Sequence, residues 1–296
     1  MDLSEKAPDM SGEEKRKEYE KRLHGVSGFP TTHVSGSGRV HVEGIGEIRV
    51  SGSGYVSPEE IKISGSGKLP GGLKVKSVRC SGSVSVEGNI EAEDMGFSGS
   101  ASVDGNVTAK RLSCAGSFSV HGEIKADLLE TAGSFRAGNR VELEDTMRAA
   151  GSVRVAGDIK AKNLVSIRGF IDVDGKIVAD RFEARLGRGG RSESQVLGGI
   201  QAANVIVKKK DTSGITILNL PLLRRLLPES RLYTADIVAE EKIHLENVSC
   251  NNVRGRDVTI SEGCVVKGKV SYSGTVSVHS AARLAFPPER TSETKG

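Results

Sequence analysis

The sequence predicts an all-β protein built as a β-helical solenoid with coils of about 17 residues, and three observations carry this prediction. Glycine is abundant, at 37 of 296 residues, whereas aromatic residues are scarce, with 7 Phe, 4 Tyr and no Trp. A globular core of this size normally draws on large aromatic side chains, so an elongated fold with a thin aliphatic core is favoured. A glycine marker also recurs at near-constant spacing. Between the markers, apolar and polar residues alternate as in a strand with one buried face.

The first segments differ in composition. Residues 1–30 are expected to form a disordered polar tail, because charged residues dominate them and leave little to bury. Residues 31–185 are expected to form β-helical coils. The Ser-Gly-Ser-Gly stretches at 35–38, 51–54 and 64–67 are interpreted as turns of the first coils, since apolar residues keep their register around them. The alternative interpretation is a flexible Gly/Ser linker.

The repeat is clearest over residues 80–185. Its marker glycines follow one another at almost equal intervals, at Gly82, Gly99, Gly116, Gly133, Gly151 and Gly169. One unit is too small to bury its own apolar face, but units stacked at the ~4.8 Å strand spacing bury a continuous core. When the units are aligned by their glycines, the apolar positions form two core rows: Val86, Val103, Val120, Val155 and Val173 in the first, and Ile90, Val107, Ile124, Val141, Ile159 and Ile177 in the second.

Residues 186–235 interrupt this repeat and are expected to contain a short helix or turn. Their leucine-rich part, 215–227, is bounded by Pro221 and Pro228, which limit any helix to a short piece. The favoured interpretation is a segment that packs against the solenoid and covers it. The alternative is an amphipathic contact with a membrane surface. Its candidate residues are Leu222, Leu223, Arg224, Arg225, Leu226 and Leu227.

Alternation resumes over residues 236–285, which are expected to form further coils, and 286–296 are expected to be a disordered tail. A solenoid has two ends, and each end presents unpaired backbone groups and a cross-section of apolar side chains. The terminal segments are polar and offer no apolar cap. Contacts between the ends of two chains are therefore expected at Val34, Val40, Val276 and Val278.

Charge and hydropathy narrow the set of partners. The 42 basic and 38 acidic residues give a net charge of +4 and alternate along the chain, whereas a nucleic-acid-binding protein more often carries a concentrated basic stripe. Nucleic acid is therefore not an expected partner. No apolar run approaches the ~18 residues that span a bilayer, and the N-terminus lacks the pattern of a secretory signal. A cytoplasmic location is expected, with association at a membrane surface left open.

No catalytic residue, cofactor site, nucleotide site or metal site is expected, and the chain is predicted not to be an enzyme. The six histidines are scattered singly, and no phosphate-binding or hydrolase motif is complete. Outward carboxylates such as Glu87 and Asp104 would need long loops around them to form a catalytic cleft, and these coils are uniformly short. Cys80 and Cys114 share an inward row two coils, or ~9.6 Å, apart. That separation is too large for a disulfide, so free buried thiols are expected.

The repeat V-x-V-x-G-x-I-x-A, recurring once per coil, resembles that of the bactofilins, a family of polymer-forming cytoskeletal proteins. Residues 120–126 and 155–161 carry the likeness best. The resemblance implies a right-handed β-helix that assembles end to end into non-polar filaments without nucleotide. It also implies frequent membrane association through a short tail. This chain differs from the family pattern in having more coils and an interruption at 186–235.

The function expected from the resemblance is a structural cytoskeletal scaffold. Copies of the chain would be its main partner and would assemble end to end into nucleotide-independent filaments or sheets. The alternative is a β-helical binding module that does not polymerise and that acts at the membrane or cell envelope, with envelope proteins as partners.

Overall fold

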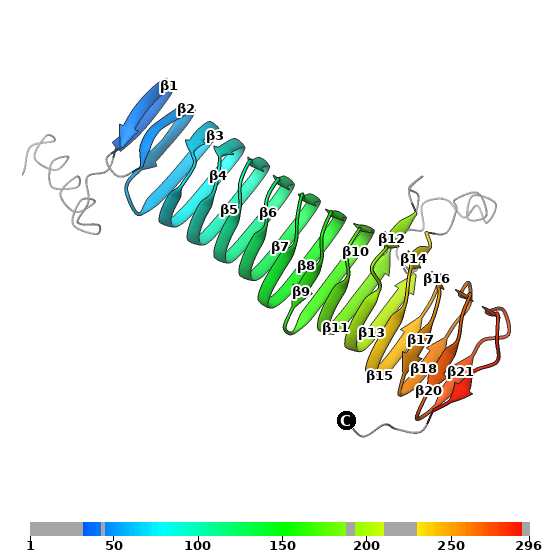
Figure 1. Ribbon diagram of the computed structural model, residues 1–296. Coiled ribbons are helices and arrows are strands. Elements are labelled where there is room, and N and C mark those ends of the chain that lie inside the picture. The colour runs from blue at the N-terminus through cyan, green and yellow to red at the C-terminus, as the bar shows by residue number, and fades with distance from the viewer. Residues whose placement is uncertain (1–31, 43–44, 188–192, 210–229, 292–296) are drawn as a thin grey trace, which may run out of the picture.

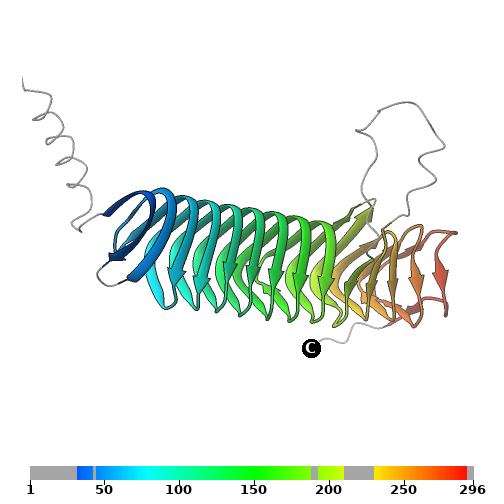
Figure 2. The same ribbon diagram turned by 90° about the horizontal axis from the view of Figure 1, so that it is seen from above.

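The computed structural model describes residues 32–42, 45–187, 193–209 and 230–291. Every regular element within these residues is a strand, and the strands form one 23-stranded sheet wound into a solenoid of about 12 turns. The coils stack along a single axis, with β1 (Thr32–Val42) at one end and β21 (Val276–Val278) near the other (Figure 1, Figure 2). The prediction of an all-β solenoid built from coils of this size is confirmed.

The middle of the solenoid consists of five long strands, each of which supplies most of one coil. In the coil that begins at Ile90, three pairs of side chains point inward: Ile90 and Ala92, Met95 and Phe97, and Ala101 and Val103. Polar residues at the corners separate these pairs, so the chain closes around a thin core. The five strands are β4 (Leu73–Glu87), β5 (Ile90–Val103), β6 (Val107–Val120), β7 (Ile124–Ala137) and β8 (Val141–Val155).

One corner of each coil is made by the marker glycine, which lies inside a continuous strand. Gly99, Gly116 and Gly133 pair with one another in successive coils, and their φ angles are 121°, 128° and 124°. Side chains other than glycine rarely adopt this region. The same stacking aligns aromatic residues of the core: Phe118 pairs in register with Phe135 of the next coil, and their rings are stacked with centroids 6.0 Å apart.

The N-terminal strands differ from the expected coils. β1 (Thr32–Val42), β2 (Gly46–Val56) and β3 (Glu60–Pro70) form an antiparallel meander, and the parallel ladder begins only at β3–β4. The Ser-Gly-Ser-Gly stretches therefore lie within strands rather than in turns between coils. The short connections are not the reason, because the parallel pair β3–β4 is joined by a link that is just as short. A complete coil takes 17 or 18 residues from one marker glycine to the next, whereas Gly65 follows Gly52 after only 13, so the chain folds back there instead of completing a turn.

The segment 186–235 also differs from its prediction, because the ladder continues through it. β13 (Ile200–Lys209) pairs in parallel with β11 (Ile177–Leu186) on one side and β15 (Ile237–Leu245) on the other. The predicted short helix or turn and the candidate membrane residues fall in 210–229, outside the described residues. The shorter strands of this part are β9 (Ile159–Ala161), β10 (Leu164–Val173), β12 (Ser194–Val196) and β14 (Leu232–Thr234).

The last coils are built from short strands. The solenoid extends beyond residue 286, where a disordered tail was expected, because Ser271 and Tyr272 pair with Glu289 and Arg290. The strands are β16 (Val248–Cys250), β17 (Val253–Gly255), β18 (Asp257–Ile260), β19 (Val265–Val266), β20 (Val270–Tyr272), β21 (Val276–Val278), β22 (Arg283–Leu284) and β23 (Glu289–Arg290).

Candidate self-assembly surfaces

The N-terminal end of the solenoid is the edge strand β1. Among the described strands it pairs with β2 alone, so its other edge carries backbone N–H and C=O groups without a strand partner. Its inward residues are largely covered: Val34 is 8% and Val42 is 5% exposed, and Val40 is partly buried. Glu47 lies between Arg39 and Arg49 at this end, with N–O separations of 3.4 and 3.5 Å. This end therefore offers mainly a polar strand edge.

The C-terminal end is more open. β21, β22 and β23 pair with β18, β19 and β20 of the preceding coil, and no described strand follows them. Apolar side chains of this last coil face solvent: Val278, which pairs with buried Ile260, is 38% exposed, and Phe286 is 52% exposed. Val276 and Leu284 are partly buried against the core beside them. The end thus combines free strand edges with an apolar cross-section, which is the arrangement that recruits further strands.

The four predicted end contacts therefore occupy different environments. Val34 is buried within its own chain, Val40 and Val276 are partly buried, and Val278 is the exposed member. Sequence reasoning missed Phe286, which was assigned to a disordered tail. The sequence pattern could have placed Phe286 in the last coil, because Leu284 and Phe286 continue the period-two alternation of the preceding coils.

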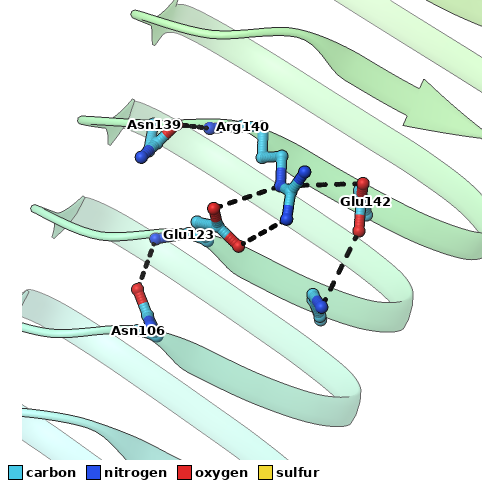
Figure 3. A network of polar contacts seen from close by, with 6 residues as sticks. Asn106, Glu123, Asn139, Arg140 and Glu142 are labelled. Atoms are coloured by element: carbon cyan, nitrogen blue, oxygen red, sulfur yellow. Dashed lines mark hydrogen bonds and ion pairs between the residues drawn. The ribbon is translucent and has the colours of Figure 1, made fainter.

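The sides of the solenoid carry charges that tie one coil to the next. Figure 3 shows one such corner, where Arg140 lies between Glu123 and Glu142. The Arg140 guanidinium is 3.1 Å from the carboxylate of Glu123, and the backbone N–H of Glu123 donates to Asn106 Oδ1 at 2.8 Å. A similar ion pair joins Arg111 to Asp94 one coil away, and it holds the pKa of the Asp94 carboxyl below its usual range.

The outward carboxylates considered for catalysis serve the same purpose. Glu87 pairs with Lys68, and Asp104 lies 3.2 Å from His121. Asp158 accepts a hydrogen bond at 2.8 Å from the backbone N–H of Lys176 in the following coil. In the part of the chain that the structure describes, no group of three or more His, Cys, Asp or Glu side chains is placed to hold a metal ion. The side chains described here therefore tie coils together.

The core rows named from the sequence lie inside the solenoid. Ile124, Val141 and Ile159 have no exposed surface, and the least buried member of either row, Ile90 or Val155, is 2% exposed. All four cysteines are free and buried, and burial raises the pKa of the Cys80 thiol to about 12. A search of the described residues finds no helix long and apolar enough to cross a membrane.

Comparison with known proteins gives one match. Residues 31–125 match the family model of the bactofilins, which is described as polymer-forming cytoskeletal. The matched segment runs from the antiparallel meander to the start of β7. No curated protein and no solved structure matches. The family match supports a polymer-forming cytoskeletal role for this chain.

Proposed function

We propose that the protein is a structural scaffold whose copies join end to end through the terminal coils, without nucleotide, to form filaments or sheets. The observation that carries this proposal is the open C-terminal coil, where Val278, which pairs with buried Ile260 of the preceding coil, and Phe286 are exposed to solvent. Similar side chains in the middle of the solenoid are covered by a coil on each side. A second chain placed against this end would supply the missing coil.

Physical chemistry favours such a contact at an open solenoid end. Removing apolar surface from water is favourable, and free N–H and C=O groups along a strand edge gain partners at the same time. The coils are also rigidly tied to one another by backbone ladders, so little conformational entropy is lost when a flat end is covered. The bactofilin match over residues 31–125 supports the same role independently of this geometry.

The test places charges on the C-terminal end. We expect the variant Val278→Lys/Phe286→Lys to lose the ability to assemble. Sedimentation and electron microscopy, both in the absence of nucleotide, measure this loss. A matched control is available on the side of the solenoid, because Leu197 and Val238 are also exposed apolar residues, at 55% and 40%. Leu197→Lys/Val238→Lys adds the same charge but leaves both ends intact, so we expect this variant to assemble like the parent.

The N-terminal end is tested separately with Val40→Lys, which adds a charge within the edge strand β1. We expect this variant to shorten or abolish polymers, because a filament needs a contact at each end of every subunit. If both end variants are folded and polymerise as readily as the side control, the contact lies elsewhere and the proposal is wrong. Discrete particles of the parent protein under all conditions would favour the alternative of a binding module that does not polymerise.

A further inference from the structure

A Ser-Gly-Ser-Gly motif occurs three times at the N-terminal end, and backbone packing explains the glycines of its middle copy. A Cβ atom added to Gly52 would lie 2.1 Å from the carbonyl oxygen of Ser64. One added to Gly54 would lie 2.1 Å from the carbonyl oxygen of Lys62. Both oxygens belong to β3, so the backbone of the neighbouring strand occupies the space of the side chains. The three copies are residues 35–38 in β1, 51–54 in β2 and 64–67 in β3, the first strands in Figure 1.

The two glycines of β1 have no such neighbour. Within the described residues, nothing lies within 4 Å of a Cβ atom built on Gly36 or Gly38, and both residues are exposed. A φ of 93° accounts for the glycine at position 36. Gly38 does not have a positive φ. An interior glycine weakens a strand and often marks the place where another backbone approaches closely. No contact among the described residues therefore accounts for Gly38.

One register repeats across the three antiparallel strands. Gly52 pairs with Gly36 of β1 on one side and with Gly65 of β3 on the other. In both pairings the flanking serines of one strand lie opposite those of the next. The marker glycines of the meander thus form one column, as they do further along the solenoid. The same step taken once more, across the free edge of β1, pairs Gly36 with Gly36 of a second copy.

The second glycine of the motif follows the same rule. Gly54 lies opposite an inward apolar residue on both sides, Val34 in β1 and Ile63 in β3. Gly38 lies opposite Val50 in β2, and its other side is the free edge. A second copy paired through Gly36 would place its own Val34 opposite Gly38. That arrangement gives Gly38 the two neighbours that Gly54 already has.

We infer that β1 pairs antiparallel with β1 of a second copy in this register, with Gly36 at the twofold axis. Carbonyl oxygens of the second copy then lie beside Gly36 and Gly38, as those of β3 lie beside the glycines of β2. The inference rests on the proposed end-to-end assembly, and it specifies the partner strand and the register of the N-terminal contact.

The antiparallel order of the meander suits such a contact. A strand and its own copy, related by a twofold axis perpendicular to the sheet, run in opposite directions, so a self-complementary strand edge forms an antiparallel ladder. β1, β2 and β3 already pair in this way, whereas β3 and the coils that follow it are parallel. Six strands from two chains then form one continuous antiparallel sheet. A slip by one residue would bring inward side chains of one copy opposite outward ones of the other, which disfavours that register.

The experiment uses the full chain with its C-terminal ends blocked by Val278→Lys/Phe286→Lys. This variant should form no polymer, but its β1 edge is intact, so we expect it to dimerise in analytical ultracentrifugation. Adding Gly38→Ala should weaken the dimer on the order of a hundredfold, because each new methyl group meets a backbone oxygen of the other chain. The unfolding temperature of the separate chains should not fall, since position 38 has no positive φ and an open surrounding among the described residues.

A matched control adds Gly96→Ala to the same blocked variant. It makes the same chemical change on the side of the solenoid, where a Cβ atom would meet only side-chain atoms at 3.7 and 3.8 Å. We expect this control to dimerise as tightly as the blocked variant itself.

The register is measured by cross-linking in the blocked variant. Ser35 of one chain lies opposite Ser37 of the other in the inferred pairing. A mixture of Ser35→Cys and Ser37→Cys chains, oxidised with diamide, should therefore give more disulfide-linked dimer than either variant alone. The four native cysteines are buried and should not contribute.

Three results would overturn the inference: a blocked variant that stays monomeric, a Gly38→Ala dimer as tight as its control, or equal cross-linking in the mixture and in the separate variants. Each of them leaves the proposed function standing if the parent still polymerises. A parent that forms no polymer while the blocked variant dimerises through β1 would instead contradict the proposed function and support the strand pairing.

Discussion

At the scale of single residues, the marker glycine is dictated by backbone packing. A Cβ atom added to Gly116 would lie 2.1 Å from the carbonyl oxygen of Gly99 in the preceding coil. The positive φ of 128° independently disfavours any other residue. Both constraints recur in the coils from Gly82 to Gly169, because these glycines stack on one another. The repeat is therefore visible in the sequence as one glycine per coil at near-constant spacing.

The first prediction is that Gly116→Ala destabilises the solenoid by about 3 kcal/mol or more, because the new methyl group must displace backbone and adopt a strained φ. The control is Gly96→Ala in the adjacent coil, where a Cβ would meet only side-chain atoms at 3.7 and 3.8 Å. Thermal unfolding followed by circular dichroism measures both variants. Equal unfolding temperatures for the two would contradict the packing argument.

Carboxylates on the surface link stability to pH. The hydroxyl and the backbone N–H of Thr275 both donate to Asp257 and hold the pKa of that carboxyl below its usual range, with a further contribution from Arg256. The unfolded chain lacks these bonds. An acid whose pKa is lower in the folded state stabilises the fold at any pH above its unfolded value, and this contribution is lost as the pH falls through the folded value.

The second prediction follows from the lowered pKa of Asp257 in the folded state. The unfolding temperature of the parent should be level near pH 6 and fall as the pH drops below about 4, where unfolded aspartates take up protons. Asp257→Asn removes the titrating group, so its unfolding temperature should be lower at pH 6 but should fall less on acidification. Asp127→Asn, at an exposed aspartate elsewhere on the solenoid, serves as the control. Parallel curves for the parent and Asp257→Asn would contradict the assignment.

At the scale of elements, alternation predicts where strands lie but not which way they pair. Period-two alternation is the same whichever way a strand runs, so the coil interpretation and the antiparallel meander bury largely the same residues. The spacing of the glycines was the available signal, because Gly65 follows Gly52 after only 13 residues, whereas later coils take 17 or 18. The continuation of the ladder through β13 was harder to predict, because β13 and β15 pair across a long intervening segment.

Elements of a solenoid should also differ in local stability, because each coil contacts only its neighbours. The third prediction is that, in the variant Val278→Lys/Phe286→Lys, amides of β6 and β7 exchange with solvent at least ~100-fold more slowly than those of β21–β23. Hydrogen exchange read by mass spectrometry measures this gradient. In the assembled parent, β21–β23 should become protected as a second chain covers them. Uniform protection in the unassembled variant would contradict the nearest-neighbour picture.

At the scale of the whole molecule, the chain is a straight rod with two unlike ends. The composition already indicated this shape, since so few aromatic residues suit a thin core of Val, Ile, Leu and Ala. The exposure of the ends could not be predicted from composition or alternation. Whether Val34 or Val278 is covered depends on where the last strand stops and what lies beside it, and the two residues have the same local pattern.

The fourth prediction concerns the repeat along a filament. A solenoid of about 12 turns at ~4.8 Å per turn is roughly 58 Å long. If the C-terminal end of one chain met the N-terminal end of the next, Val278 and Phe286 would face β1, whose inward Val34 and Val42 are already buried. If two C-terminal ends meet about a twofold axis, the exposed apolar residues of one chain cover those of the other, which is the self-complementary contact of an isologous interface. We therefore expect the second arrangement, with the N-terminal strand edges meeting likewise.

Such a filament has no polarity and repeats every two subunits, at roughly 116 Å. Electron micrographs of filaments formed without nucleotide measure this repeat directly in their power spectra. Attaching a small globular tag to the C-terminus provides the control, since tags should then appear in close pairs separated by untagged stretches. A repeat of one subunit length, with evenly spaced tags, would show that subunits join head to tail instead, and the twofold contact through Val278 and Phe286 would be wrong.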